Sequence, residues 1–240
     1  MTPKPTLKLD WCSHEAAKYA CEKWHYSGRM YVNKTVKIGV WEGAEFVGVV
    51  VYGTGCQHLG NPYGLTTFET CELVRVALRS HAHPVSRMLA VSFSMLRKAN
   101  PKLRLIVSFS DTAQGHHGGI YQATNWLYAG SMSYHEYEVK GERVPPRTMY
   151  NRHGKGGQSV AWLRANVDPN ARRVETPPKH KYLMPLDAAM RAKVLPLSKP
   201  YPKKTRAGSD TGDTPADQAG EGSAILTPAL HTPPTPPEAD

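Results

Sequence analysis

The chain has 240 residues, of which 40% are hydrophobic, enough for one large or two small domains. Its 30 lysines and arginines outnumber its 20 aspartates and glutamates, which gives a formal net charge of +10. No apolar run approaches the ~18 residues that span a bilayer, and the first residues, MTPKPTLKLDW, lack an apolar signal segment. These features exclude an integral membrane protein, and we expect a cytoplasmic protein without a membrane partner.

The charge is distributed unevenly along the chain. Residues 201–240 have a net charge of −3 and seven of the 20 prolines, so we expect a disordered tail that cannot bury enough apolar surface to fold. Residues 136–200 have a net charge of +7. A basic segment favours a polyanion as partner, most often nucleic acid, and the alternative is a solvated basic face without a partner.

The predicted elements alternate between helices and strands. Apolar spacing predicts helices, and period-2 alternation predicts strands, two of which form a hairpin. Ser13 is the expected N-cap of the first helix, and the second lies between two prolines. In chain order we expect a helix, a hairpin, a strand, a helix, a strand, a short helix and a strand: residues 14–24, 36–41 with 46–52, 71–78, 85–100, 103–110, 120–123 and 126–128.

This order predicts an α+β fold with a mixed central sheet flanked by helices. The step from strand 71–78 to strand 103–110 should be a right-handed parallel crossover, and ligands bind beyond the C-terminal ends of such strands. The order fits the sheet of GNAT (acyl-CoA N-acyltransferase-like) proteins. We expect three regions: a GNAT-like catalytic core at 1–135, a basic extension at 136–200 that completes the fold and contacts DNA, and the tail at 201–240.

Strand 71–78 contains a charge that needs a partner. Strict alternation places Glu72 and Val76 on one face and Arg75 on the other. A buried guanidinium needs an anion beside it. We therefore expect Arg75 to contact a ligand phosphate or one of three carboxylates: Asp111, Glu72 or Glu22.

Asp111 directly follows an apolar strand and precedes a loop rich in glycine and histidine. A carboxylate in such a partly dry place can have a raised pKa and act as a general base. The alternative is a helix N-cap, a role that aspartate also fills well. We favour the general base.

Other polar residues can line the same cleft. His25 and Tyr26 end the first helix, and Tyr121 follows Asp111 by ten residues, where it is an acid, a base, a stacking residue or part of the core. His116 and its neighbour His117 point in different directions, which makes them a weak joint metal pair.

GNAT enzymes bind the pyrophosphate of coenzyme A at the start of the helix that follows the third strand, with the pattern Q/R-x-x-G-x-G/A. The corresponding stretch here, RSHAHPVSR (79–87), lacks the glycines, which argues against ordinary acetyl-CoA use. Free amides at this helix start, together with Arg79, Ser86 and Arg87, can still bind an anion, so a coenzyme A derivative stays open as a cofactor.

Several stretches, covering about residues 10–200 but not the tail, are specific enough to suggest a family. The most specific is RLIVSFSDTAQGHHGGIYQATNWLYAG (104–130); the others are CEKWHYSGRM (21–30), KIGVWEGAEFVGVVVYG (37–53), CELVRVAL (71–78), HPVSRMLAVSFSML (83–96) and KHKYLMPLD (179–187). They resemble the phage Mom family of DNA adenine-modification proteins, which is related to GNAT enzymes.

The resemblance implies an enzyme that converts adenine in phage DNA to N6-(carbamoylmethyl)adenine and so shields the DNA from host restriction enzymes. It also implies an iron requirement and a small-molecule group donor of undefined chemistry. Carried over by motif, the catalytic residues are His25 and Tyr26 of WHYS, Arg75 of ELVRVAL, and Asp111 and Tyr121 of SDTAQGHHGGIYQ. For the metal we expect His25 and Asp111, with His116 or His117 as third ligand.

The chemistry is compatible with these residues. The lone pair on adenine N6 is delocalised into the ring, so a base must remove an N6 proton, and we expect Asp111 in this role with a tyrosine assisting. The adenine must leave the duplex, so we expect it to stack on aromatic residues: Trp24, Tyr26, Tyr121 or Trp126. The expected contacts to double-stranded DNA phosphates are Arg143, Arg147, Arg152, Lys155, Lys179 and Lys181.

Two other functions remain open from the residues. A GNAT acyltransferase that uses acetyl-CoA on a protein or small molecule would bind coenzyme A and would not need the strong positive charge. A non-catalytic DNA-binding protein would bind DNA in a salt-sensitive way and leave adenine unmodified.

Overall fold

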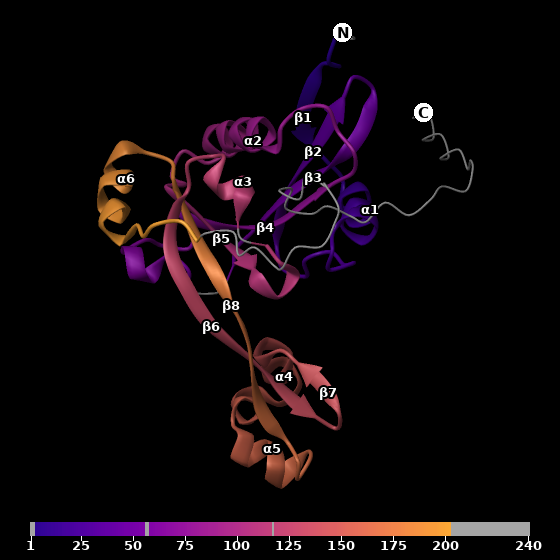
Figure 1. The fold of residues 1–240 in the computed structure, drawn as a ribbon, viewed down its shortest axis with the longest axis vertical. Helices are drawn as coiled ribbons and strands as arrows, with labels where there is room; N and C mark the ends of the chain where they lie inside the picture. Colours follow the sequence, from indigo (N-terminus) through magenta and orange to yellow (C-terminus); the bar gives the residue numbers. More distant parts are fainter. Residues whose placement is uncertain (1–2, 56–57, 117, 203–240) are drawn as a thin grey trace, which may run out of the picture.

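The computed structural model describes residues 3–55, 58–116 and 118–202 (Figure 1). Nearly all of the expected tail lies outside this part of the chain, as does His117. One eight-stranded sheet has the order β1-β2-β3-β4-β5-β8-β6-β7. The strands are β1 (Leu7–Trp11), β2 (Thr35–Glu42), β3 (Glu45–Gly53), β4 (Thr70–Leu78), β5 (Leu105–Asp111), β6 (Leu127–Val139), β7 (Glu142–Val144) and β8 (Arg172–Pro185).

The predicted α+β class and the flanked mixed sheet are confirmed. β4 and β5 are parallel and are joined through α2, whereas the other neighbouring strands are antiparallel. The helices are α1 (His14–Trp24), α2 (Val85–Ala99), α3 (Gly119–Gln122), α4 (Pro146–His153), α5 (Val160–Asn166) and α6 (Ala188–Val194). No helix in the described residues is long and apolar enough to cross a membrane.

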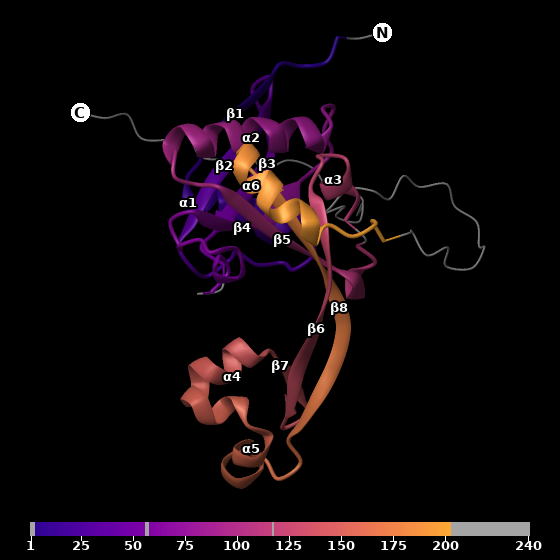
Figure 2. The ribbon, with the colours of Figure 1, turned by 90° about the vertical axis from the view of Figure 1, so that its left-hand side faces the viewer.

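Helices cover both faces of the sheet (Figure 2). On one face, α2 and α3 pack on a large cluster that includes Tyr52, Ile106 and Trp126. On the other face, α1 packs on β3 and β4, and α6 packs on β5 and β8. The Ser13 side chain accepts a hydrogen bond from the Ala16 amide and caps α1, as predicted.

A β-bulge in β4 overturns the predicted assignment of faces. Leu73 and Arg75 stand opposite consecutive residues of β3, so Val74 is the extra residue of the bulge. Leu73 and Val76 consequently pack in the same cluster beneath α2. The prediction that Glu72 shares a face with Val76 is wrong, because the alternation shifts by one residue at the bulge. Glu72 and Arg75 lie on the same face, the one that α1 covers.

The parallel pairing of β4 and β5 is short. It runs from Thr70 opposite Leu105 to Leu73 opposite Ser108, and beyond that point each strand follows its other neighbour. β4 continues along β3 to Leu78, while β5 continues along β8. The two central strands therefore part just where the bulge begins, and backbone groups at this point are not occupied by a sheet partner.

A second, smaller lobe stands at the far end of β6 and β8 (Figures 1 and 2). These two strands leave the main body as a long antiparallel pair and carry β7, α4 and α5. The lobe has a core of its own, made by Tyr137, Val139, Val144, Met149, Leu163 and Ala171. The basic segment 136–200 thus forms this lobe and then returns to the main body through β8 and α6.

The separate core of the lobe makes a prediction about stability. Met149 is 1% exposed, so Met149→Ala should leave a cavity and cost the lobe about 2–5 kcal/mol. Hydrogen exchange measured by mass spectrometry should show faster exchange confined to residues 137–171. Equal acceleration in β2 and β3 would contradict an independent lobe core.

Candidate functional site

A polar cluster lies where β4 and β5 part, at the C-terminal end of β5. Side chains from five segments reach it: the exit of α1, strand β4, the end of β5, the loop that follows β5, and strand β8. The members are His25, Tyr26, Glu72, Arg75, Asp111, His116 and Lys179. The structure therefore brings together four of the five predicted catalytic residues directly, and Tyr121 stands beneath them.

Tyr26 lies between two histidines. Its ring centroid is 4.3 Å from that of His25 and 5.1 Å from that of His116. The Ser27 amide donates to Nδ1 of His25, which fixes Nε2 as the protonated nitrogen of the neutral ring. Burial, with the nearby charges of Arg75 and His116, lowers the pKa of His25 to about 3. His25 is therefore neutral at physiological pH.

Asp111 has both carboxylate oxygens engaged. Oδ1 accepts a hydrogen bond from the Ala113 amide at 3.1 Å and caps the short turn that follows β5. Oδ2 lies 3.4 Å from Nζ of Lys179, and that ammonium also stands 4.7 Å from the Tyr134 ring centroid. The alternative reading of Asp111 as a cap is thus confirmed, and its catalytic role stays a prediction.

Tyr121 is buried in the core beneath the cluster. Its hydroxyl lies 2.9 Å from Oγ of Ser108, which itself donates to the Leu73 carbonyl at 2.7 Å, so Tyr121 donates to Ser108. Burial raises the pKa of Tyr121 well above its ordinary value. The ring stacks on Tyr182 at 4.6 Å. These contacts make Tyr121 a hydrogen-bond donor that supports the parting strands, and its stacking face is already covered.

Trp126, predicted to stack on a base, has no exposed surface and packs against Phe93 at 5.8 Å and Tyr121 at 5.1 Å. Trp24 packs against Phe46 at 5.9 Å. Tyr26, by contrast, is 46% exposed. Of the four predicted stacking residues, Tyr26 is therefore the one at the cluster with a free ring surface.

Arg75 is held by backbone carbonyl groups. Nη1 donates to the Val74 carbonyl at 2.7 Å and Nε to the Arg29 carbonyl at 3.5 Å, while the guanidinium lies 5.9 Å from the Tyr31 ring centroid. No carboxylate in the described residues forms an ion pair with Arg75, although the charge of Arg75 acts to lower the pKa of Glu72. Arg75 can therefore offer its remaining N–H groups to an anionic ligand.

Glu72 is a member of the cluster that the sequence pattern did not single out as catalytic. Burial raises its pKa to about 7, and the charges of Arg75 and Lys179 act against that rise. A glutamate among the apolar residues of CELVRVAL was the available signal. The sequence predicted Glu72 only as one of three possible carboxylate partners of Arg75, and strict alternation placed the two residues on opposite faces of the strand.

The predicted anion site at the start of α2 is already partly occupied. The Glu42 carboxylate accepts hydrogen bonds from the Ala82 and His83 amides, so these two amides are not free for a coenzyme. Arg79 pairs with Glu45. Ser86 and Arg87 lie in the first turn of α2, and their role in binding a donor stays a prediction.

The six predicted DNA contacts fall in two places. Arg143, Arg147, Arg152 and Lys155 belong to the lobe, and none of them forms an ion pair within the part of the chain that is described. Lys179 and Lys181 belong to β8, where Lys179 pairs with Asp111 and Lys181 lies 5.0 Å from the Tyr63 ring centroid.

The lobe faces the same side as the cluster. The charge of Arg147 on α4 lowers the pKa of Tyr31, against the larger effect of burial. Tyr31 in turn stands beside Arg75. An elongated polyanion bound to the lobe would therefore pass near the cluster.

The predicted iron ligands do not form a coordination shell. In residues 3–55, 58–116 and 118–202, no group of three or more His, Cys, Asp and Glu side chains is placed to hold a metal ion. His25 and His116 flank the Tyr26 ring, and Asp111 is engaged with Lys179 and a backbone amide. The iron stays a prediction, and no step is assigned to it.

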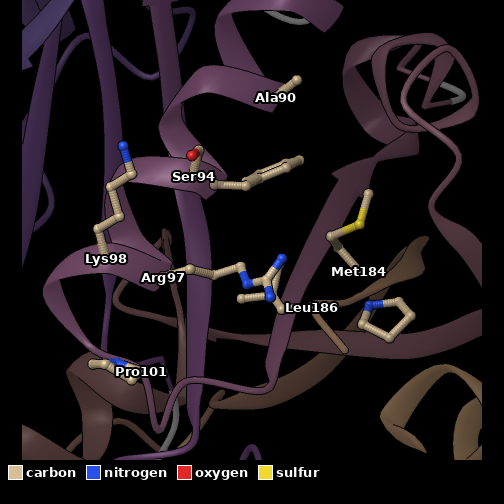
Figure 3. Close-up of a pocket in the computed structure, with 9 residues that line it drawn as sticks. Ala90, Ser94, Arg97, Lys98, Pro101, Met184 and Leu186 are labelled. Atoms are coloured by element: carbon tan, nitrogen blue, oxygen red, sulfur yellow. The ribbon is translucent and has the colours of Figure 1, made fainter. Parts of the chain in front are cut away.

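A pocket of about 570 Å³ lies away from the cluster (Figure 3). It is formed by the last turns of α2 and the end of β8, and Arg97, Lys98, Met184 and Leu186 line it. None of the predicted site residues lies there. Two of its lining residues, Arg97 and Lys98, are exposed cations like those of the lobe.

The sequence model of the Mom protein family matches residues 6–203. This chain belongs to the Mom protein family. It is 30% identical over 205 residues to the protein named methylcarbamoylase mom of Escherichia phage Mu, which covers 82% of this chain and 84% of that protein. The Mom match includes β6, β8 and the lobe between them, so the lobe belongs to the shared extent of the family.

The buried carboxyl group makes a prediction about pH. The folded-state pKa of Glu72, about 7, exceeds its ordinary value of 4.5, so its stabilising contribution is full below pH 4.5 and is lost as the pH rises through 7. Glu72→Gln should remove this loss, so the variant should gain up to about 3 kcal/mol in free energy of unfolding relative to wild type between pH 4.5 and pH 8. Urea denaturation at both pH values measures it, and an unchanged pH dependence would contradict the buried carboxyl group.

Proposed function

We propose that this chain is a DNA-modifying enzyme that transfers a carbamoylmethyl group to N6 of adenine. Membership of the Mom family and the similarity to a phage methylcarbamoylase support the proposal. The observation that carries it is the polar cluster at the parted strands, with the unpaired cations of the lobe on the same side. Modified adenine would then protect DNA, including phage DNA, from restriction enzymes.

The parting of β4 and β5 supports a relation to GNAT proteins and gives the small-molecule donor a place. The Leu73 and Val74 carbonyls accept hydrogen bonds from Ser108 and Arg75, and backbone groups beyond them on the separated strands can pair with an extended ligand such as a coenzyme A derivative. Arg75 has N–H groups left for a phosphate or a carboxylate of this donor. We propose that the donor lies between the two strands, with its reactive carbon at the cluster.

The acceptor is adenine in double-stranded DNA, extruded from the helix because its N6 is otherwise paired. Tyr26 offers the exposed aromatic surface on which the base would stack, and the neutral His25 holds the Tyr26 ring in place. Burial and the charge of Asp111 raise the pKa of Tyr26, which keeps its hydroxyl protonated as a donor. Tyr121 and the Asp111–Lys179 pair support this arrangement.

The lobe would hold the duplex beside the extruded base. The four cations Arg143, Arg147, Arg152 and Lys155, which form no ion pair with other described residues, can replace counterions on the phosphates, which supplies affinity without sequence preference. The strands β6 and β8 set the separation between the lobe and the cluster (Figure 1). We propose that the reaction takes place in the cytoplasm of the cell that contains the DNA.

The modification itself is the first test. Nucleosides from plasmid DNA of cells that express the full chain should include an adenine derivative heavier by a carbamoylmethyl group, detected by mass spectrometry. Asp111→Asn removes the charge that pairs with Lys179 at the cluster, so the amount of this derivative should fall. Unmodified adenine with a folded, DNA-binding protein would favour a non-catalytic DNA-binding protein, and binding of acetyl-CoA without DNA modification would favour an ordinary acyltransferase.

The lobe surface makes a separate prediction about DNA affinity. Arg147→Gln with Arg152→Gln should lower duplex affinity and reduce the slope of log K against log salt by up to about 0.9 for each phosphate that the variant no longer neutralises. Arg97→Gln with Lys98→Gln removes the same charge from the pocket of Figure 3 and should leave both values near wild type. Equal reductions for the two double variants would show that only net charge matters. Fluorescence anisotropy with a labelled duplex measures both.

A further inference from the structure

We propose that Glu72 is the general base that accepts the N6 proton of adenine. This assignment rests on the function proposed above and specifies which side chain performs the proton transfer. The sequence favoured Asp111 for this role. The fold gives Asp111 hydrogen-bond and ion-pair partners that Glu72 does not have among the described residues.

Asp111 is engaged on both oxygens, by the Ala113 amide and by Lys179. Both oxygens of this carboxylate therefore already face a partner, a backbone amide on one side and an ammonium on the other. The Glu72 carboxylate forms neither a hydrogen bond nor an ion pair of this kind with the described residues, although it lies among charged and hydroxyl groups. It is the carboxylate of the cluster that is available for proton transfer.

The position of Glu72 in the sheet suits this role. It lies in β4 opposite Val107 of β5, two residues before the bulge and one pair before the strands part. On its other side it stands opposite Gly53 of β3. A rigid strand that is paired on both edges therefore fixes the backbone of Glu72, while its side chain lies at the mouth of the opening.

The loop after β3 keeps space for this carboxylate. Gly55 has a φ of +66°, and a Cβ there would lie 2.9 Å from Oε2 and 3.2 Å from Cβ of Glu72. Any larger residue at position 55 would be strained by its backbone and would also push against Glu72. Leu59 closes the same loop, since a Cβ at Gly55 would lie 2.7 Å from its Cδ2.

The groups around Glu72 come from every neighbouring segment. Two cations, Arg75 and Lys179, favour the ionised carboxylate, whereas its burial favours the neutral acid and brings the pKa to about 7. Burial, and to a smaller extent the charge of Glu72, raises the pKa values of three neighbouring groups, so all three stay protonated. They are the Tyr31 and Tyr121 hydroxyls and the Cys71 thiol. A base with a pKa near the working pH is the most effective, since it is both ionised and basic.

The step balances with a donor of one chemical class, an electrophilic carbamoylmethyl compound that carries a leaving group. The N6 lone pair forms the bond to the methylene carbon, and the bond from that carbon to the leaving group breaks with its electron pair. The N6–H bonding pair stays on nitrogen, and the proton moves to the Glu72 carboxylate. The resulting carboxylic acid returns the proton to solvent.

The test uses the full chain expressed in cells and the nucleosides of a resident plasmid. Glu72→Gln keeps the shape but not the proton acceptor, and carbamoylmethyladenine should fall by at least about 100-fold. Glu15→Gln makes the same chemical change on the exposed first turn of α1 and should keep wild-type levels. Thermal melting and duplex affinity of each purified variant, measured by fluorescence anisotropy, report on folding and DNA binding, and neither should change enough to explain the fall.

A second pair of variants tests the role of Glu72 as the base even if Glu72→Gln does not fold. Glu72→Asp and Glu72→Asn have equal size and differ in the proton acceptor, so modification by the Asp variant should exceed that by the Asn variant at least tenfold. Equal modification by the two, or wild-type modification by Glu72→Gln, would overturn the assignment. Absence of carbamoylmethyladenine from cells with the wild-type chain would instead overturn the proposed function, and with it this inference.

Discussion

The parting of β4 and β5 is the feature on which the rest of this structure depends. Two parallel strands at the centre of a sheet normally pair along their length, because each unpaired backbone group would otherwise lose a hydrogen bond. Here the bulge at Val74 turns β4 away with β3, and β5 continues with β8. The same bulge turns Arg75 to the face of Glu72, so one local irregularity creates both the opening and its charged lining.

The cations of this molecule form two sets, one beside the opening between β4 and β5 and one on the lobe. Cations beside the opening are engaged: Lys179 pairs with Asp111 and Arg75 donates to backbone carbonyls. Four cations of the lobe, Arg143, Arg147, Arg152 and Lys155, form no ion pair among the described residues and are available for phosphates, whereas Arg172 and Arg173 pair with Glu138 and Glu175. The long antiparallel pair of β6 and β8 joins the lobe to the cluster.

Sequence patterns predicted the central elements because their signals are local. The apolar spacing of α1 and α2 and the alternation of β2 and β3 survive in the fold with small changes at their ends. β8 escaped prediction because it contains Pro177 and Pro178 and many charges, features that argue against a strand. The pairing of β8 with β6 shifts near these prolines, and partners distant in sequence stabilise the strand.

The sequence by itself determined the α+β class, the parallel crossover, the basic segment and, through its motifs, the residues that meet at the site. It could not determine which carboxylate lacks a partner among the described residues, because that depends on Lys179 reaching Asp111 from a strand 68 positions later in the chain. Nor could it show that Trp126 and Tyr121 are enclosed in the core. A bulge, an ion pair and burial are consequences of tertiary packing, and these three decided the chemistry that each side chain of the cluster can perform.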